Sequence, residues 1–443
     1  MTVKMKAIIS LLAVLYVFGF ITACNQDSED NNNVYSSNIF NVVKVTPGDL
    51  LAPEYGETDE AARTAAIGAN DFAFRLSAIL VEKAKNENFI FSPYSVWMPL
   101  AALVNAADDQ SKAGLLTALG ASGISEADIN RAASRMLYDL TKMRNRDYDE
   151  YYNPLKITNA IFVGNNVTLR KSFAQTFMDY FRGNSINVDF SSRDAVDAVN
   201  QWASESTNGL ITNVVQQFDP LTVAAIANAI YFSDGWQREF NSDITKEDVF
   251  YSAAGESSAF YMRREGDGQI YYEDDKIQAL PLWFKTGGYM LIMLPKPGND
   301  AAELLASMSN DYFNEIQNKL SEASGTLLLP RFSIENDING LKNALEALGV
   351  PLFDEITAPL TKGIIEEDIP VFLTDAMQKA LIKVDEKGTT AAAVTVLLAG
   401  TTSMPQPTIP FEMICNRPFV FILCEHTHDG GSQILFTGVV NRP

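Results

Sequence analysis

The sequence is poor in the residues on which most enzymes and nucleic-acid-binding proteins depend. Its 443 residues include two histidines and three cysteines, and 34 basic residues stand against 55 acidic ones, for a net charge of −21. This balance excludes the basic surface that nucleic acid requires. Neither His426 nor His428 adjoins a nucleophile motif, and the chain has no G-x-S-x-G motif and no phosphate-binding loop. We therefore expect no enzyme, no cofactor and no nucleic-acid partner.

The scarcity of cysteine excludes a disulfide framework. Cys415 and Cys424 are nine residues apart in the sequence, and an extended chain of that length spans roughly 30 Å. The two thiols could meet only if the chain reversed between them. We predict that both are buried free thiols, which is the usual state of isolated cysteines.

Charge is missing altogether from residues 388–411, and this stretch is the most unusual one in the chain. It connects two predicted strands, 380–384 and 419–424, and connections of this length inside a domain tend to be functional. Its middle, residues 391–398, contains only Ala, Val, Thr and Leu, a composition that suits a strand better than a solvated loop. Two interpretations fit: a strand held outside its sheet, or an ordinary edge strand followed by a long hairpin loop.

The N-terminus has the pattern of a secretory signal. Lys4 and Lys6 precede an apolar run over residues 7–21, which is short for a membrane span of about 20 residues. Residues 21–24, Ile-Thr-Ala-Cys, resemble the lipobox of bacterial lipoproteins. On this resemblance residues 1–23 are a signal peptide and Cys24 becomes the lipid-modified first residue. An ordinary signal peptide or an uncleaved anchor is the alternative.

The residues after Cys24 are polar and rich in asparagine and acidic side chains, so they cannot bury apolar surface. We predict a disordered tether over residues 24–62. Its acidic start looks like the export signal of some Bacteroidetes lipoproteins. We therefore expect a protein that is lipid-anchored in the outer membrane of a Gram-negative bacterium and surface-exposed or secreted.

Residues 63–443 show no internal repeat and no break in composition, which indicates one α+β domain. Apolar residues recur at helical spacing in several stretches, and Ser92 and Pro93 have the positions of an N-cap and a first helical residue. The predicted helices are 61–85, 93–106, 110–119, 125–143, 171–181, 193–207, 301–308, 311–320 and 338–348. The predicted strands are 89–91, 156–163, 223–232, 260–262, 270–272, 279–284, 289–294, 326–332, 380–384 and 419–424, with turns at 266–268 and 287–288.

Several separated stretches together resemble the serpins, a family of protease inhibitors. Each piece is weak, but they follow one another in the right order from about residue 65 to the end of the sequence. The stretches are 88–96 (compare NxxFSPxS), 199–202 with 207–211 (INxWVxxxTxGKI), 227–232 with Gly235, Trp236 and Phe240 (NAIYFKGxWxxxF), 416–421 (NRPF) and 436–441 (FxGxVxNP).

The resemblance implies three sheets, about nine helices and an exposed reactive-centre loop. A target protease would cleave this loop and be trapped as an acyl-enzyme while the loop inserts as a new strand into the central sheet. The count along the loop puts the scissile bond between Thr402 and Ser403. The loop hinge would comprise Glu386, Gly388, Thr389, Thr390, Ala391, Ala392 and Ala393.

The resemblance also implies a region where the central sheet opens, comprising Ser92, Ser95, Asn228, Trp236 and Gln378. Plain core and capping roles are the alternative for these residues. Family members often have histidine at the position of Gln378. Because an amide does not titrate, we expect no histidine-linked pH dependence of insertion.

The loop hinge departs from the family pattern at one position: Thr390 replaces a glutamate that many inhibitory members have.

The loop residues indicate the class of target. No Lys or Arg lies between Gly388 and Asn416, so a trypsin-like pocket has nothing to bind. Thr402, among small residues, suits elastase- or subtilisin-like serine proteases, and Leu397, Leu398 or Met404 would suit other enzymes, including cysteine proteases. We expect a monomer whose partners are a protease and, through Cys24, a membrane. A non-inhibitory binding or carrier serpin is the alternative.

Residues 425–429, Glu-His-Thr-His-Asp, would place two histidines on one strand face, where they could hold a divalent metal. The family comparison puts this segment in a surface hairpin. We therefore assign no metal site.

Overall fold

Helix α2 (Glu60–Ala84) begins the part of the fold that carries the core. Asp59 caps it by accepting a hydrogen bond from the backbone N–H of Ala62, and its buried positions Phe72, Leu76 and Leu80 recur at helical spacing. Among the residues that the structure describes, α2 alone is long and apolar enough to span a membrane, but most of it is buried inside the fold.

The structure is a computed structural model, and it describes residues 41–42, 45–52, 59–141, 155–207, 209, 211–219, 222–338, 340–357, 359–366, 369–389, 409–427 and 430–443. These belong to one compact unit that runs from Ile39 to Pro443. The predicted signal peptide, Cys24 and residues 24–40, 43–44 and 53–58 of the predicted tether lie outside the described residues. The described part of the tether contacts the domain: residues 41–42 pair with β4, and the N–H groups of Gly48 and Leu51 donate to Asp179 and Ser134.

Nine α-helices are formed by the described residues: α2 (Glu60–Ala84), α3 (Pro93–Leu103), α4 (Asp109–Ala118), α5 (Glu126–Thr141), α6 (Lys171–Phe181), α7 (Arg193–Ser206), α8 (Ala301–Ala306), α9 (Asn310–Lys319) and α10 (Leu341–Ala347). Short 3-10 turns cover Ser242–Ile244 and Thr361–Gly363. All nine helices overlap those predicted from the sequence.

The described strands form three sheets. The five-stranded sheet has the order β1 (Asn41–Val42), β4 (Gly183–Val188), β3 (Leu155–Gly164), β5 (Ala224–Phe232) and β13 (Leu373–Met377). The four-stranded sheet has the order β12 (Phe332–Asp337), β14 (Lys379–Val384), β15 (Gly388–Thr389) and β6 (Asp234–Gly235).

The third sheet has nine strands. Its order is β16 (Ile409–Ile414), β11 (Ser321–Pro330), β8 (Gly255–Glu273), β9 (Ile277–Trp283), β10 (Tyr289–Pro295), β17 (Phe419–His426), β18 (Ser432–Val440) and β2 (Phe89–Phe91), and β7 (Lys246–Ser252) pairs with β8 beside this path. The mixed α and β architecture and the three sheets confirm the predicted fold class.

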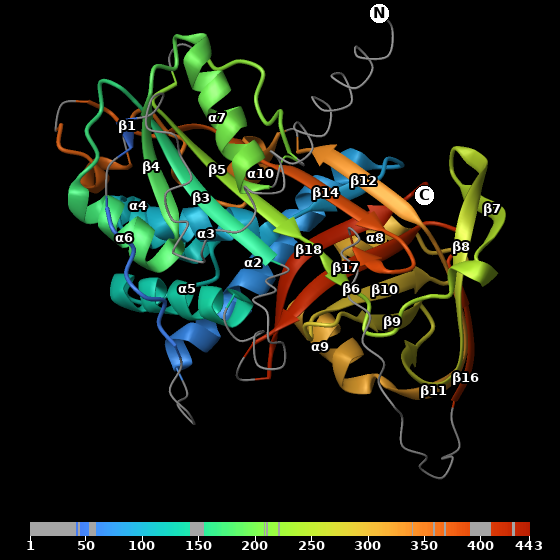
Figure 1. Ribbon diagram of the computed structural model, residues 1–443. Helices are drawn as coiled ribbons and strands as arrows, with labels where there is room; N and C mark the ends of the chain where they lie inside the picture. The colour runs from blue at the N-terminus through green and yellow to red at the C-terminus, as the bar shows by residue number, and fades with distance from the viewer. Residues whose placement is uncertain are drawn as a thin grey trace, which may run out of the picture. The chain divides into compact units, whose positions relative to one another are not determined.

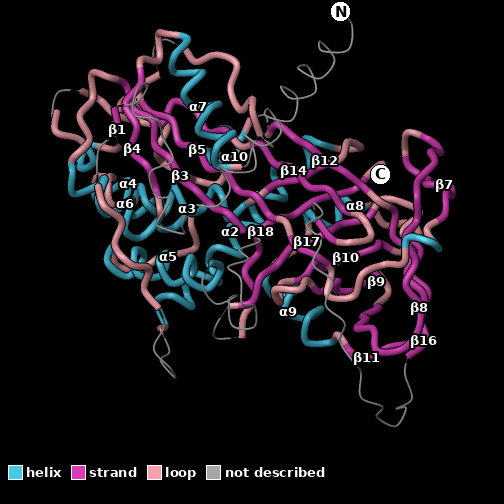
Figure 2. The backbone as a smooth tube through the Cα atoms, in the orientation of Figure 1, coloured by secondary structure: helices cyan, strands magenta, loops and turns pink. Residues whose placement is uncertain are grey.

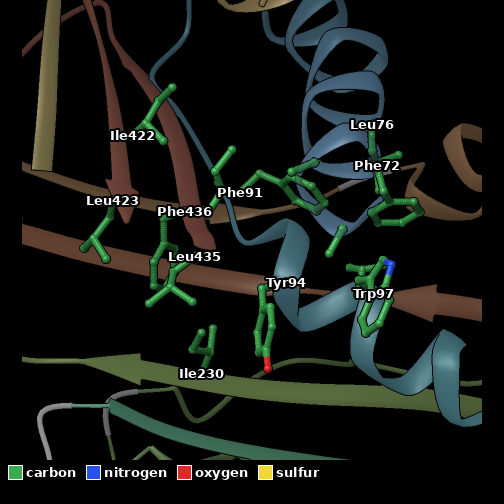
Figure 3. Close-up of a cluster of buried hydrophobic side chains, with 14 of the residues drawn as sticks. Phe72, Leu76, Phe91, Tyr94, Trp97, Ile230, Ile422, Leu423, Leu435 and Phe436 are labelled. Carbon is green, nitrogen blue, oxygen red and sulfur yellow. The ribbon is translucent and has the colours of Figure 1, made fainter. Parts of the chain in front are cut away.

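The helices pack on both sides of the five-stranded sheet. In Figure 1, α7 lies in front of β3, β4 and β5, and α3 lies behind β3 and β5. Helix α3 is buried on every face, so it joins this sheet to the rest of the core. Figure 3 shows Phe72 and Leu76 of α2, Tyr94 and Trp97 of α3, and side chains of β2, β17 and β18 gathered with Ile230 of β5.

Two predictions about local structure meet different outcomes. The turn predicted at residues 266–268 is wrong, because β8 continues through it as one strand from Gly255 to Glu273. Gly266 and Gly268 have positive φ angles, and the register with β11 shifts beside them, so the two glycines make an irregularity within the strand. The buried free thiols are confirmed: Cys415 and Cys424 are both free and buried, and burial raises the pKa of Cys415 to about 12.

Candidate functional site: the hinge that follows strand β14

Strand β15 brings the first residues of the uncharged stretch into a sheet. Gly388 and Thr389 lie antiparallel between the end of β14 and β6, with Val384 opposite Thr389 on one side and Asp234 opposite Thr389 on the other. Figure 2 shows β14, the strand that leads to this region, and Figure 1 labels β6. The sequence led us to expect the whole stretch outside its sheet, but these two residues are already paired within it.

Hydrogen bonds to backbone carbonyls hold the turn between β14 and β15. The N–H of Trp236 donates to the carbonyl of Lys387 at 2.8 Å, and the N–H of Phe240 donates to that of Glu386 at 2.9 Å. The indole Nε1 of Trp236 donates to the carbonyl of Asp385 at 2.9 Å. Trp236 is fully buried and stacks on Phe284 with ring centroids 4.6 Å apart. The segment after β6 therefore binds the hinge through one tryptophan and two backbone amides.

Gly388 is required by the close approach of two backbones. A Cβ atom at this position would lie 2.1 Å from the carbonyl oxygen of Asp234 and 2.7 Å from the Cα of Gly235. Its φ of 153° also lies in a region that side chains rarely adopt. No residue other than glycine fits the space between β14 and β6.

Thr389 is fully buried beside a buried acidic residue. Its hydroxyl Oγ1 lies 3.3 Å from the backbone nitrogen and 3.4 Å from the carbonyl oxygen of Asp234. The Asp234 carboxylate accepts hydrogen bonds from the N–H and the hydroxyl of Thr286. A small side chain that can form hydrogen bonds fits this position, whereas a long or charged one does not.

Glu386 anchors the start of the hinge with an ion pair. Its carboxylate accepts hydrogen bonds from Nε and Nη2 of Arg331 at 2.9 and 2.6 Å, and from the hydroxyl of Thr245 at 2.6 Å. Burial alone would raise the pKa of Glu386, but the hydrogen bonds from Arg331 and Thr245 outweigh it and hold the pKa below its ordinary value.

Strands β5 and β14 lie next to each other below the hinge but do not pair directly in the described part of the chain. Strand β5 pairs instead with β13, which precedes β14 in the chain. Strand β13 is parallel to β5, with Leu373 to Met377 opposite Ala224 to Ala227. Beyond Gln378 the chain continues as β14, which pairs with β12 over its full length. Among the described residues no strand register joins β14 to β5, although the two lie close to each other. A further strand entering below β15 would therefore have two strand edges to pair with.

Ser92, Ser95 and Gln378 meet at the point where β13 passes into β14. The amide of Gln378 donates to the carbonyl of Ser92 at 2.7 Å and accepts from its N–H at 2.9 Å. The hydroxyls of Ser92 and Ser95 are 2.8 Å apart, and that of Ser92 also donates to the carbonyl of Leu435. All three side chains are buried. Their hydrogen bonds connect the N-terminal turn of α3 to the strand that leads into the hinge.

Asn228 lies across a small cavity from this cluster. The cavity has a volume of about 10 Å³ and is lined by Ser95, Asn228 and Gln378 among other residues, which is enough for about one water molecule. The amide of Asn228 donates to Asn159 on β3 at 2.5 Å and forms no hydrogen bond to Gln378. The structure thus brings Ser92, Ser95 and Gln378 into direct contact, sets Asn228 opposite them, and holds Trp236 separately at the hinge.

The remaining residues proposed for the loop, Thr390, Ala391, Ala392, Ala393, Thr402 and Ser403, lie outside the described residues, as does Cys24. The two-histidine segment 425–429, to which no metal site was assigned, is described only up to Thr427, and within it His426 stacks on Trp283. Within the described ranges no group of three or more potential ligands could hold a metal ion.

The residues that bind the hinge from other elements were not predicted from the sequence. Arg331 and Thr245 are 55 and 141 positions away from Glu386 in the chain. One signal was available for Arg331, which is the only basic residue between Lys319 and Lys342 and lies near the end of the predicted strand 326–332. For Thr245 and Asp234 no pattern in the sequence pointed to the hinge.

Comparisons with known proteins agree with this arrangement. Residues 68–443 match the family model described as Serpin (serine protease inhibitor). The chain is 30% identical over 408 residues to Alpha-1-antitrypsin 1-3 of Mus musculus, covering 89% of this chain and 94% of the mouse protein.

Two solved structures illustrate the similarity in fold. The native state of Tengpin, a thermophilic serpin, superimposes with a TM-score of 0.75 at 24% identity and covers 89% of this chain and 97% of its own. Thyroxine-binding globulin in complex with thyroxine has a TM-score of 0.70 at 23% identity, over 85% of this chain and 99% of its own.

The Glu386 ion pair predicts a pH-dependent stability. Glu386→Gln should lower the free energy of unfolding by about 1–2 kcal/mol at pH 7. The Arg331 guanidinium would then donate to a neutral amide oxygen in place of a charged carboxylate. Since the fold lowers the pKa of Glu386, its contribution is present above the unfolded pKa of about 4.3 and is lost as the pH falls through the folded pKa. Urea unfolding between pH 7 and pH 3 should show the two proteins converging at acid pH.

Glu335→Gln is the matched control, because Glu335 pairs with Lys379 on the same sheet but is 54% exposed, where ion pairs contribute under about 1 kcal/mol. An equal effect of the two substitutions, or a difference that persists at pH 3, would contradict the role given to Glu386.

Gly388→Ala should displace β15 from the sheet, because the added methyl group overlaps the carbonyl of Asp234. The amides of Trp236 and Phe240 would lose their acceptors, and hydrogen exchange in a peptide covering residues 234–240 should become at least about tenfold faster. Gly123→Ala is the control, since Gly123 also has a positive φ but nothing lies within 4 Å of its added Cβ. Unchanged exchange in Gly388→Ala would show that the hinge is not held as described.

Proposed function

Because the chain belongs to the serpin family, we propose that it is a suicide-type protease inhibitor. A target protease cleaves the loop between β15 and β16, and the loop then inserts between β5 and β14 as a new strand. The observation that carries this proposal is the position of Gly388 and Thr389, already paired between β14 and β6. They form the first pairs of a strand that would continue along the edges of β14 and β5.

The proposed chemistry is an acyl transfer that does not finish. The nucleophilic serine of the protease attacks the carbonyl carbon of Thr402, the bond to the nitrogen of Ser403 breaks, and that nitrogen leaves as an amine after it gains a proton. The loop residues up to Thr402 stay bound to the protease as an ester. Their insertion into the sheet carries the protease away and distorts its active site before water can hydrolyse the ester.

The hinge residues suit this insertion. With a period of two, Thr389, Ala391 and Ala393 would point to the same face of the sheet, and Thr389 is already fully buried there. Small side chains need little opening of the sheet. If roughly a dozen residues each gain ladder bonds with a net value of about 1 kcal/mol, insertion is favourable by on the order of 10 kcal/mol. This is comparable to the stability of a whole domain.

The target we propose is an elastase- or subtilisin-like serine protease. The uncharged loop offers nothing to a specificity pocket that contains a carboxylate, and Thr402 is small enough for a narrow pocket. Leu397, Leu398 or Met404 would extend the range to cysteine proteases.

A non-inhibitory binding or carrier function is the second candidate. It is favoured by the similarity in fold to thyroxine-binding globulin, which was solved with thyroxine. The small residues at positions 389–393 favour insertion instead, because a carrier would tolerate bulky or charged residues at these positions.

We also propose that the domain acts at a cell surface as a lipoprotein anchored through Cys24. The lipobox-like residues 21–24 and the polar tract after them support this proposal. Because β1 pairs residues 41–42 with β4, a coil would cover only the 16 or so residues from Asn25 to Phe40, with a root-mean-square span of about 22 Å.

The inhibitor should form a covalent complex with an elastase-like protease that survives SDS, and the cleaved protein should melt at a higher temperature than the intact one. Ala391→Arg should yield cleaved protein without complex, because insertion would bury an unpaired charge between β5 and β14. Ala392→Arg is the matched control: it adds the same charge one residue later, where strand alternation points it to the opposite face. Complex formation by Ala391→Arg, or no gain in melting temperature on cleavage, would contradict insertion.

Mass spectrometry of the fragment released by elastase should place the cleavage within one or two residues of the bond between Thr402 and Ser403. The fragment would begin near Ser403 and end at Pro443. Cleavage well before Ala399 would contradict the assignment, because too few loop residues would remain to span the sheet.

A further inference from the structure

A second cavity lies between strands β8 and β9, beside the segment after β6 that binds the hinge. Its volume is about 110 Å³, and Figure 2 shows the two strands that form it. The segment after β6 closes its third side. The lining residues are Gln237, Arg238, Arg264, Gly268, Gln269, Ile270, Leu280, Pro281 and Trp283.

Two arginines line this cavity, and neither is paired with an acidic side chain in the described part of the chain. Nη2 of Arg264 donates to the carbonyl of Arg238, and its guanidinium lies over the ring of Phe240 at 4.3 Å. Nη2 of Arg238 donates to the carbonyl of Glu265 at 3.1 Å. Both guanidiniums thus contact neutral partners only, in a chain whose net charge is −21.

The nearby carboxylates are engaged elsewhere. Glu265 pairs with Arg263, which is exposed and does not line the cavity, and Glu239 pairs with Lys285 at 2.9 Å. The positive charge of Arg238 and Arg264 is therefore not neutralised from within the protein. Burial and the neighbouring Arg238 lower the pKa of Arg264 to about 9, which reflects the cost of holding its charge without an anion.

Two polar atoms of residues that line the cavity have no hydrogen-bond partner within the described ranges. Nε of Arg264 is buried and has no hydrogen-bond partner among the described residues. Oε1 of Gln269 also has none, but this oxygen accepts hydrogen bonds and would be satisfied by a donor such as water and not by an anion. Unsatisfied buried polar groups are rare in folded proteins, because a bound water or ion commonly supplies the partner that the protein lacks. An anion that accepts from Arg264 would satisfy its guanidinium.

The rest of the lining is apolar. Leu280 and Pro281 are buried, and Ile270 and Trp283 are half-buried; all four line the cavity together with the two arginines. An engineered cavity of about 150 Å³ holds benzene, so this one has room for about four or five non-hydrogen atoms. The ligand that fits is small, negatively charged at one end and apolar at the other.

We propose that this cavity binds a small organic monocarboxylate, with its carboxylate between Arg238 and Arg264 and its alkyl end against Leu280, Pro281 and Trp283. Guanidinium groups bind carboxylates through two parallel hydrogen bonds, which favours a planar carboxylate over a point charge. The site is separate from the residues that insert or are cleaved. It goes beyond inhibition of a protease and does not depend on it.

Trp283 supplies a direct reporter of binding. Of the four tryptophans, Trp97, Trp202 and Trp236 are fully buried, and Trp283 alone is partly exposed and lines the cavity. Sodium propionate, titrated at constant ionic strength, should change the tryptophan fluorescence in a saturable way. Arg264→Gln and Arg238→Ala should each weaken binding at least about tenfold, by loss of a charged hydrogen-bond donor.

Arg263→Gln is the matched control, because it removes the same charge from the neighbouring position without touching the cavity, and its affinity for propionate should be unchanged. Arg238 is exposed, so Arg238→Ala tests the site even if Arg264→Gln fails to fold. The proposal would be overturned by an absence of saturable response, by equal binding of the neutral analogue propionamide, or by sulfate binding more tightly than propionate. Equal weakening by Arg263→Gln would also overturn it.

Discussion

Backbone hydrogen bonding is the constraint on which this structure depends. Strands β5 and β14 lie close to each other, yet no strand register joins them among the described residues: β5 pairs with β13, and the end of β14 pairs with β15. Each peptide group near such an edge needs a partner or water. A segment that supplies both donors and acceptors in strand geometry is therefore favoured between β5 and β14, and the chain has such a segment directly after Thr389.

Contacts from other elements hold the start of the hinge, residues 385–389, in place. Glu386 is bound by Arg331 and Thr245, while Trp236 and Phe240 bind the carbonyls of the turn. These contacts fasten residues 385–389. At the other end of β14, Gln378 is bound to Ser92 at the first turn of α3.

Much of the secondary structure could be predicted from the sequence, because it depends on local patterns. Helix α2 follows from apolar spacing, and α3 from Ser92 and Pro93 at its first turn. Strands β1, β4, β6, β7, β13, β15, β16 and β18 were not predicted, and β12 was predicted only at Phe332. Their short or mixed patterns gain strand structure only from neighbours. The turn expected at residues 266–268 was wrong for the same reason: pairing with β7, β9 and β11 holds β8 straight through its glycines.

The sequence by itself determined the fold class, the family resemblance and the unusual stretch after Glu386, because motifs and missing charges can be counted along a chain. It also pointed to Ser92, Ser95 and Gln378. Only the tertiary structure decided that Gly388 and Thr389 are already paired, that Arg331 binds Glu386, and that Arg238 and Arg264 face one cavity. These contacts join residues far apart in the chain. Their free energy comes from burial and from hydrogen bonds between distant elements, which a local pattern does not contain.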